Sequence, residues 1–114
     1  MGEKVKITTG DLELTGTLDD TPAARQVAEN LPAEGLVQTM GREIYFFVNF
    51  TVDAEELSDD APGGSIAYWP PGSALCLFFG QRPVSPVAIV GKLDGEPSKL
   101  ADALSGELIR VEKA

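Results

Sequence analysis

Short stretches in which apolar and polar residues alternate recur along the chain, and a period of two is typical of half-buried β-strands. Residues 3–9 and 12–18 show the pattern and are separated by a Thr9-Gly10-Asp11 turn, which predicts a hairpin. Further strands are predicted in four later stretches: 35–39, 43–48, 87–93 and 108–112. Turn residues recur about every 8–12 positions without a βαβ rhythm, which indicates a small barrel or sandwich rather than a parallel sheet.

The most hydrophobic part of the chain is Ala67–Gly80, which contains the only tryptophan and the only cysteine. Pro70 and Pro71 have no backbone donor, so Trp69 is expected at the end of a strand, and the Trp69–Pro70 bond is compatible with either isomer. The six apolar residues Ala74–Phe79 then predict a strand that is covered on both faces. Trp69 at this rigid corner either fills the core or forms the wall of a pocket, and the size of its side chain favours the core.

Two short helices are predicted beside the strands. Thr21 is a suitable N-cap before Pro22, and the helix carries an apolar stripe of Ala24, Val27, Ala28 and Leu31. A second helix is expected from Ser98 to a stop at Gly106, with Leu100, Ala103 and Leu104 facing inward. The segment 51–64, which contains five acidic residues and no basic one, is expected to form a solvated loop or a short helical insert.

The composition narrows the classes of function. The 114 residues predict one domain, 1–114, and the formal charge of −9 argues against nucleic acid or an anionic membrane as partner. One cysteine forms no internal disulfide, and we find neither an apolar leader nor a membrane-spanning run, so we expect a cytoplasmic protein. The chain has no histidine, which removes the commonest general base and metal ligand, and no cofactor or metal site is predicted.

A mixed surface is the candidate for chemistry. Glu43, Tyr45 and Phe47 share one face of a predicted strand, and an acid beside two aromatic rings suits a ligand better than plain solvent. Trp69 at its corner and Arg82 after the central strand are the other candidates. No basic residue lies within four positions of Cys76 in the sequence. Cys76 is therefore expected to be an inert packing thiol.

Four segments together resemble the signature of a small prokaryotic cyclophilin-like family: Glu43–Phe46, Tyr68–Gly72, Ala74–Gly80 and Val90–Lys92. The resemblance implies a mainly β fold, a closed eight-stranded antiparallel barrel with two short capping helices. It does not imply proline isomerase activity, because the histidine, the Phe-His-Arg strand and the Gln-Gly-Gly-Asp run of the authentic isomerases are missing. Where this family pattern has Gly-Asp, the chain has Gly64-Ser65.

Three functions follow as hypotheses. The first is a binding module for a small molecule or peptide, whose pocket is walled by Tyr45, Trp69 and Phe79 and supplied with charge by Glu43 and Arg82. The second is an atypical peptidyl-prolyl isomerase in which Arg82 or Arg42 bonds the twisted imide nitrogen. The third is a scaffold whose partner docks on the acidic 51–64 segment or on a barrel edge, and a homodimer is possible. We predict the first.

Overall fold

The computed structural model describes residues 2–54, 56–80, 83 and 85–114, and this part of the chain forms nine strands, one α-helix and two 3-10 turns. In chain order the elements are β1 (Glu3–Thr9), β2 (Leu12–Leu18), α1 (Pro22–Glu29), β3 (Ala33–Leu36), β4 (Gln38–Met40), β5 (Glu43–Phe47), β6 (Ser65–Trp69), η1 (Pro70–Gly72), β7 (Ala74–Phe78), β8 (Ala88–Leu93), η2 (Pro97–Asp102) and β9 (Leu108–Lys113). The predicted strands and the first helix are therefore confirmed.

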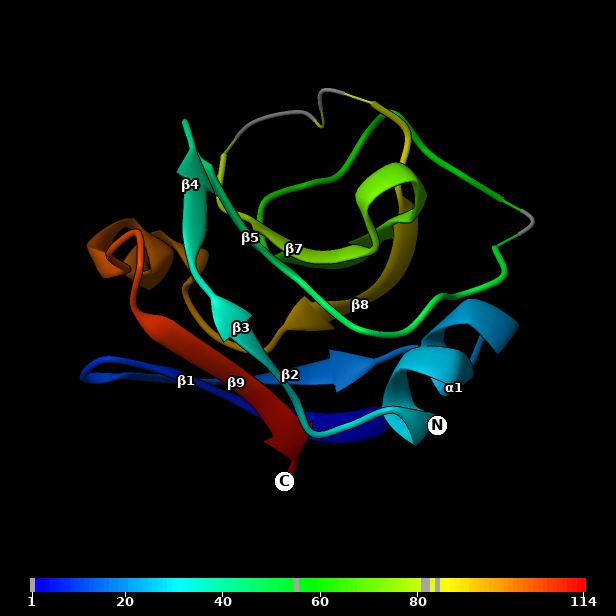
Figure 1. Ribbon diagram of the computed structural model, residues 1–114, viewed down its shortest axis with the longest axis horizontal. Helices are drawn as coiled ribbons and strands as arrows, with labels where there is room; N and C mark the ends of the chain where they lie inside the picture. The colour runs from blue at the N-terminus through cyan, green and yellow to red at the C-terminus, as the bar shows by residue number, and fades with distance from the viewer. Residues whose placement is uncertain (1, 55, 81–82, 84) are drawn as a thin grey trace.

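All strands belong to one antiparallel sheet with the order β3-β9-β1-β2-β8-β6-β7-β5-β4. The first and last members of this order, β3 and β4, are joined by the single residue Val37. One continuous segment thus pairs with β9 through its first half and with β5 through its second half, and this segment closes the sheet into a barrel (Figure 1). A closed barrel leaves no long unpaired edge.

The strand count differs from the predicted eight by one. The sequence pattern treats residues 35–39 as a single strand, whereas the structure interrupts the segment at Val37. There the backbone bonds to the chain before β9, with the Val37 amide donating to the Glu107 carbonyl at 2.8 Å and the Gly106 amide donating to the Val37 carbonyl at 2.8 Å. Counted as one bent ribbon, β3 and β4 restore the eight-stranded closure.

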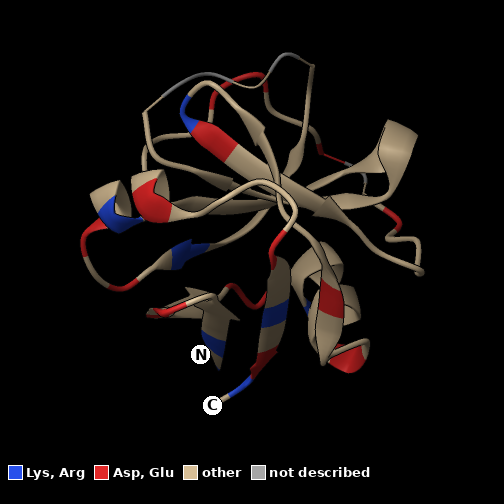
Figure 2. Ribbon diagram, turned by 60° about the vertical axis from the view of Figure 1, so that its left-hand side comes forward, with Lys and Arg blue, Asp and Glu red and all other residues tan. Residues whose placement is uncertain are grey.

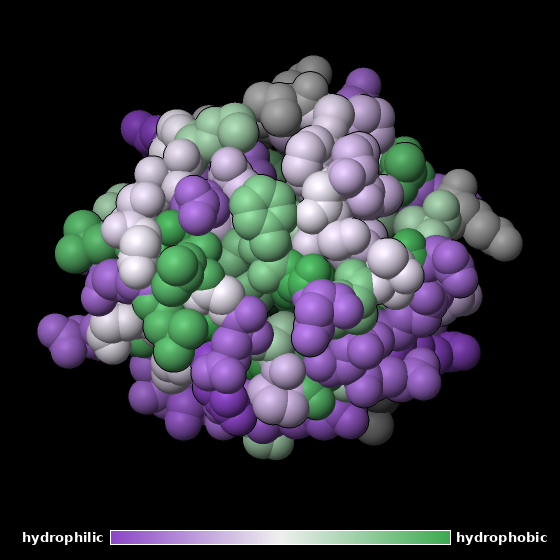
Figure 3. All heavy atoms as spheres, viewed as in Figure 1, coloured by the Kyte–Doolittle hydropathy of each residue, from purple (hydrophilic) through white to green (hydrophobic). Residues whose placement is uncertain are grey.

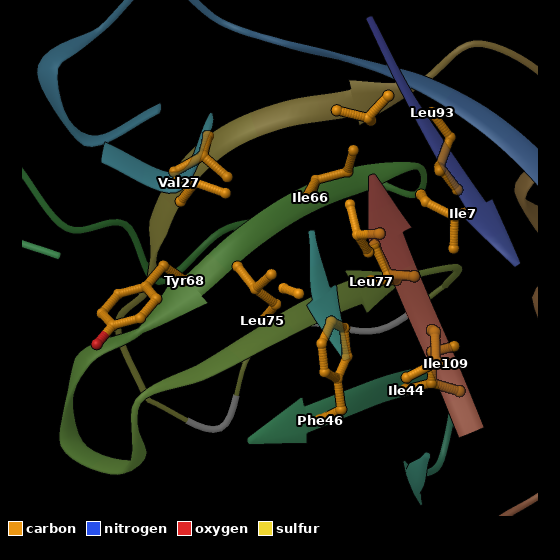
Figure 4. Close-up of a cluster of buried hydrophobic side chains, with 14 of the residues drawn as sticks. Ile7, Val27, Ile44, Phe46, Ile66, Tyr68, Leu75, Leu77, Leu93 and Ile109 are labelled. Atoms are coloured by element: carbon orange, nitrogen blue, oxygen red, sulfur yellow. The ribbon is translucent and has the colours of Figure 1, made fainter. Parts of the chain in front are cut away.

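The interior of the barrel is filled by alternate residues of every wall. Ile44 and Phe46 of β5 point toward Leu75 and Leu77 of β7 and Ile109 of β9, as Figure 4 shows. The ends are closed by α1 and by η2, which lie on opposite sides of the barrel (Figure 1) and contribute the buried residues Ala24, Val27 and Leu100. The Thr21 side chain accepts a hydrogen bond from the Ala24 amide at 3.2 Å, as predicted for the N-cap.

Two local expectations were wrong. The second helix is a 3-10 turn that begins at Pro97, and Glu96 rather than Ser98 is its N-cap. The backbone is already extended at Ala103 (φ −70°, ψ 136°), which turns the next side chain outward, so Leu104 is 62% exposed instead of buried.

The acidic segment 51–64 is a loop, as predicted, and its described acidic side chains are exposed, but two apolar residues and several hydrogen bonds attach it to the rest of the molecule. Val52 and Ala61 are buried, and the Gln26 amide group holds the Asp53 backbone in both directions, at 3.0 and 2.8 Å. Ser58 forms an isolated antiparallel bridge with Val87. Val52 belongs to the interior core cluster, whereas Ala61 belongs to the outer-face cluster beside the site described below.

Candidate functional site

The site lies on the outer face of the wall formed by β5, β7, β6 and β8. Because side chains alternate along a strand, the residues between the interior ones point outward: Glu43, Tyr45 and Phe47 from β5, Cys76 and Phe78 from β7, and Ala67 and Trp69 from β6. A second, smaller apolar cluster forms on this face, separate from the interior core.

A pocket of about 180 Å³ opens in this outer face, lined by Met40, Glu43, Tyr45, Phe47, Trp69, Cys76, Pro83, Ser85 and Val87. The strand register accounts for the hollow. Cys76 is paired with Tyr45 on one side and Ala67 on the other, and Ala74 is paired with Phe47 and Trp69. Ala74 thus lies between Phe47 and Trp69, and the small residues Cys76 and Ala67 lie side by side next to Tyr45, which leaves a depression with aromatic walls.

The aromatic walls are arranged by contacts among themselves. Tyr45 and Phe47 meet edge to face with ring centroids 5.7 Å apart, a favourable geometry for aromatic pairs. Phe47 is 53% exposed and Met40 is 37% exposed, so these two residues form the mouth, whereas Tyr45 and Trp69 are half-buried. The large exposed side chain of Phe47 is explained by this position at the mouth.

Trp69 is held on two sides. Its indole Nε1 donates a hydrogen bond to the Ser85 hydroxyl, and its ring lies against the backbone of η1. A Cβ atom added to Gly72 would meet Trp69 Cζ3 at 2.3 Å and Phe47 Cε1 at 3.3 Å, so only glycine lets the indole pack here. The residue is therefore a fixed pocket wall and not a plug of the interior, and its bond to Pro70 is trans.

Glu43 brings a carboxylate into this apolar surrounding. It is only 5% exposed, and from β5 it reaches diagonally to Cys76, whose direct cross-strand partner is Tyr45. Burial, then the negative charge of Glu43, and then the hydrogen bond from the thiol to that carboxylate raise the pKa of Cys76 far above its ordinary value. Cys76 therefore stays a protonated thiol, in agreement with the prediction of an inert cysteine, and acts as a hydrogen-bond donor to Glu43.

Of the five predicted site residues, the structure brings three together: Glu43, Tyr45 and Trp69 all line the pocket. Phe79 does not, because it follows Leu75 and Leu77 in the period of two and packs against the interior core. Arg82 lies outside the described residues. Met40, Ser85 and Val87 also line the pocket but were not among the predicted residues. Met40 is the cross-strand partner of Glu43 in the β4–β5 hairpin, a local signal that could have found it, whereas Ser85 and Val87 reach the site only through the β6–β8 pairing.

Ser65, where the resemblance leads us to expect an acid, is buried and has a local structural role. Its hydroxyl donates to the Pro62 carbonyl at 2.7 Å, and its amide bonds the same oxygen at 3.0 Å. It therefore fixes the turn that leads into β6.

The described residues contain no group of three or more His, Cys, Asp or Glu side chains placed to hold a metal ion. Among the helices of this same part of the chain, none is long and apolar enough to cross a membrane.

Apart from the pocket mouth, Leu36 and Leu108 form an exposed apolar spot, since they are cross-strand partners on β3 and β9 and more than half exposed. Figure 3 shows hydrophobic side chains gathered over this side of the molecule.

A family model described as cyclophilin-like matches residues 3–112. The chain belongs to the cyclophilin-like family. Among solved structures, the hypothetical protein AF2241 from Archaeoglobus fulgidus is similar over 99% of this chain and 95% of its own, with 31% sequence identity and a TM-score of 0.83.

A second solved structure, that of McbB in complex with tryptophan, has a TM-score of 0.77 and 16% identity over 96% of this chain. This chain matches 44% of that protein's length, and the likeness shows the shared fold alone. No curated protein matches. The resemblance read from the sequence is thus confirmed at the level of the family and its fold.

Proposed function

We propose that this cyclophilin-like protein is a binding module that takes one small molecule, or a single side chain of a peptide, into the outer-face pocket. The observation that carries the proposal is an aromatic-walled hollow that contains one buried carboxylate, built on a barrel whose interior is already filled. Mostly apolar concave sites with a few fixed polar groups are the usual ligand sites of proteins. A purely structural barrel has no need for a buried acid on its outer wall, because burial of an acid is costly.

The size of the pocket limits what it takes. Its volume of about 180 Å³ is below the roughly 300–1,000 Å³ of sites for drug-sized ligands, but above the ~150 Å³ cavity that holds a benzene molecule. This range suits one ring with a short substituent. The tryptophan in the McbB complex was bound by a protein of the same fold at 16% identity, so the proposal rests on the pocket and not on that ligand.

Binding without isomerisation is part of the proposal. Catalysed rotation of the imide bond is aided by a hydrogen-bond donor, such as an arginine, that bonds the twisted nitrogen. The described residues that line the pocket supply aromatic walls and a carboxylate but no cationic side chain. The role suggested for Arg82 in an atypical isomerase stays a prediction, as do the homodimer, the scaffold and the cytoplasmic location.

An NMR titration tests the proposal. Labelled protein is titrated with a set of single-ring compounds and with short Xaa-Pro peptides, while exchange spectroscopy follows the cis and trans peptide signals. We expect shifts centred on Tyr45, Trp69 and Cys76 and no faster exchange of the peptides. Shifts restricted to other surfaces would contradict the pocket, and accelerated exchange would replace the binding module by an isomerase.

A further inference from the structure

We infer that Ser85 sets the ligand class of the outer-face pocket, which takes an uncharged ring without a hydrogen-bonding group on the part that enters. This inference rests on the proposed function and names both the class of its ligand and a positioning residue. Ser85 acts through Trp69, because it holds the indole so that a ligand meets the ring and not its N–H group. Three features of the described residues support the inference: the fixed indole, the engaged polar groups of the lining and the dispersed charge.

The indole of Trp69 is held at two opposite edges. At one edge, Nε1 donates a hydrogen bond to the Ser85 hydroxyl. The opposite edge, with Cε3 and Cζ3, lies against η1, where a Cβ atom added to Gly72 would meet these atoms at 2.6 and 2.3 Å. A rotation that aimed the N–H group at the hollow would break the bond to Ser85 and leave a donor in need of a new partner. The indole therefore offers the pocket its apolar surface rather than its donor.

Ser85 itself is placed by the backbone that leads into β8. Because β6 pairs with β8, the residues just before β8 lie beside Trp69 at the end of β6. Val87 is fixed in addition by its bridge to Ser58, through two backbone hydrogen bonds of 2.7 and 2.9 Å. A side chain on a fixed backbone keeps its geometry before a ligand arrives. Ser85 thus positions the indole in the free protein.

The other strongly polar group of the lining is also engaged within the protein. The Glu43 carboxylate has interactions of its own, and the Cys76 thiol donates a hydrogen bond to it. The remaining described lining is mainly carbon surface, from Met40, Tyr45, Phe47, Pro83 and Val87. A polar ligand group would have to displace an existing bond or stay without a partner, and both are unfavourable in a buried site. An apolar ring meets these walls without that cost.

The charge distribution does not direct a charged ligand to the pocket. The chain carries 18 acids and 9 bases, and Figure 2 shows the acidic residues distributed over many parts of the ribbon rather than gathered at one place. A cleft concentrates charged ligands when side chains of one sign line it. Apart from Glu43, the described side chains that line this pocket are uncharged, so apolar contact is left to select the ligand.

Calorimetric titration with benzene and pyridine tests the inference. The two probes have one shape, and pyridine differs by a ring nitrogen that accepts a hydrogen bond and is uncharged at mildly alkaline pH. We expect benzene to bind the wild type about tenfold tighter, a difference of about 1.4 kcal/mol. Because hydration alone favours benzene in any apolar pocket, the decisive quantity is the change of this ratio in variants of Ser85.

The variant Ser85→Ala removes the acceptor of the indole N–H group, which then becomes available to the pyridine nitrogen. We expect the ratio of the two affinities to fall about fivefold, which corresponds to about 1 kcal/mol. Ser85→Thr keeps the hydroxyl and should keep the wild-type ratio. Ser58→Ala is the matched control, because the Ser58 hydroxyl donates to the Asp60 carbonyl at 2.8 Å and does not line the pocket.

The indole proton gives a second readout that a merely structural role of Ser85 would not move. Trp69 is the only tryptophan, so its N–H group gives one indole signal in the nitrogen-15 spectrum of labelled protein. Pyridine should shift the proton of this signal downfield in Ser85→Ala, as a new hydrogen bond does, and not in the wild type. The wild-type spectrum remains decisive where Ser85→Ala does not fold, since a downfield shift there would show that the N–H group is open to a ligand and overturn the inference.

The outcomes separate the two levels of the proposal. An unchanged ratio in Ser85→Ala, or an equal fall in Ser58→Ala or Ser85→Thr, would overturn the role of Ser85 and leave the binding module intact. Pyridine that binds the wild type as tightly as benzene would overturn the apolar ligand class in the same way. No binding of either probe to the wild type would overturn both the ligand class and the pocket as a site for single rings.

Discussion

The two sides of the barrel wall differ although the same strands build both. Along β7, Leu75 and Leu77 point into the interior, where buried side chains fill the space, whereas Cys76 lies on the outer face beside a hollow of about 180 Å³. The inner face has large aliphatic and aromatic side chains at successive positions, whereas the outer face places the small residues Ala74 and Cys76 next to the aromatic residues of β5 and β6. The filled inner face stabilises the fold, and the hollow of the outer face is the feature on which the proposed ligand site rests.

Adjacent phenylalanines on β5 give the most direct contrast between the two sides. Phe46 is fully buried and Phe47 is 53% exposed. Phe46→Ala should lower the free energy of unfolding by about 3–5 kcal/mol through lost burial and a cavity. Phe47→Ala should change it by less than about 1 kcal/mol but weaken the binding of single-ring compounds in the pocket. Urea denaturation and calorimetry measure the two effects, and similar losses of stability in both variants would refute the division between the faces.

A methyl group at Gly72 should disturb the outer face alone. Because the added Cβ would meet the Trp69 ring at 2.3 Å, Gly72→Ala forces the indole to move or η1 to shift. We expect a cost of about 1–3 kcal/mol from overpacking, a changed Trp69 fluorescence spectrum and weaker ligand binding. Gly95→Ala is the control, because an added Cβ there meets no atom within 4 Å. An unchanged spectrum in Gly72→Ala would show that the indole is not held in this way.

Cys76 should make stability fall at alkaline pH. Burial raises the pKa of its thiol, so the folded protein keeps a proton that the unfolded chain loses above its ordinary pKa of about 8.5. The contribution is complete below that pH and declines as the pH rises, by up to about 1.4 kcal/mol per pH unit. Denaturation between about pH 7.5 and 9.5 should therefore show a steeper decline for the wild type than for Cys76→Ala, and parallel profiles would contradict the buried neutral thiol.

The smallest effect is expected at Asp94, which is not among the residues that line the pocket. Lys4 donates to its carboxylate at 2.9 Å and Thr17 at 2.8 Å, and these bonds lower the pKa of Asp94. Its stabilising contribution is present above the ordinary carboxyl pKa of about 3.9 and is lost as the pH falls through the lowered value. Asp94→Asn should thus reduce the acid dependence of unfolding without affecting binding, and weaker ligand binding would show that the two regions are coupled.

Much of the division between the inner and outer faces of the barrel wall could be predicted from residue patterns. The alternation in β5 placed Glu43, Tyr45 and Phe47 on one face, and the Pro70-Pro71 corner located the end of β6 correctly. Which face of β7 points inward depends on its pairing with β5 and β6, and such pairing is not encoded in one strand. For this reason Phe79 was assigned to the pocket, although it belongs with Leu75 and Leu77.

Other features are tertiary in origin. The break at Val37 arises from bonds to the segment before β9, about 70 residues further along the chain, and no local pattern announces it. Cys76 was recognised as a packing thiol, but its place beside Glu43 needed the diagonal neighbours of the β5–β7 ladder. The acidic composition of 51–64 correctly indicated a loop with exposed acidic side chains, whereas the burial of Val52 in the core and of Ala61 in the outer-face cluster depends on tertiary contacts.

The central claim is that a ligand occupies the outer face and not the interior of the barrel. Nuclear Overhauser contacts between a bound single-ring probe and labelled methyl groups test it most directly, because Met40 and Val87 line the pocket whereas Leu75 and Leu77 lie in the core. We predict contacts from the probe to the Met40 and Val87 methyl groups and none to those of Leu75 or Leu77. Contacts to the two leucines would place the ligand inside the barrel and contradict the account.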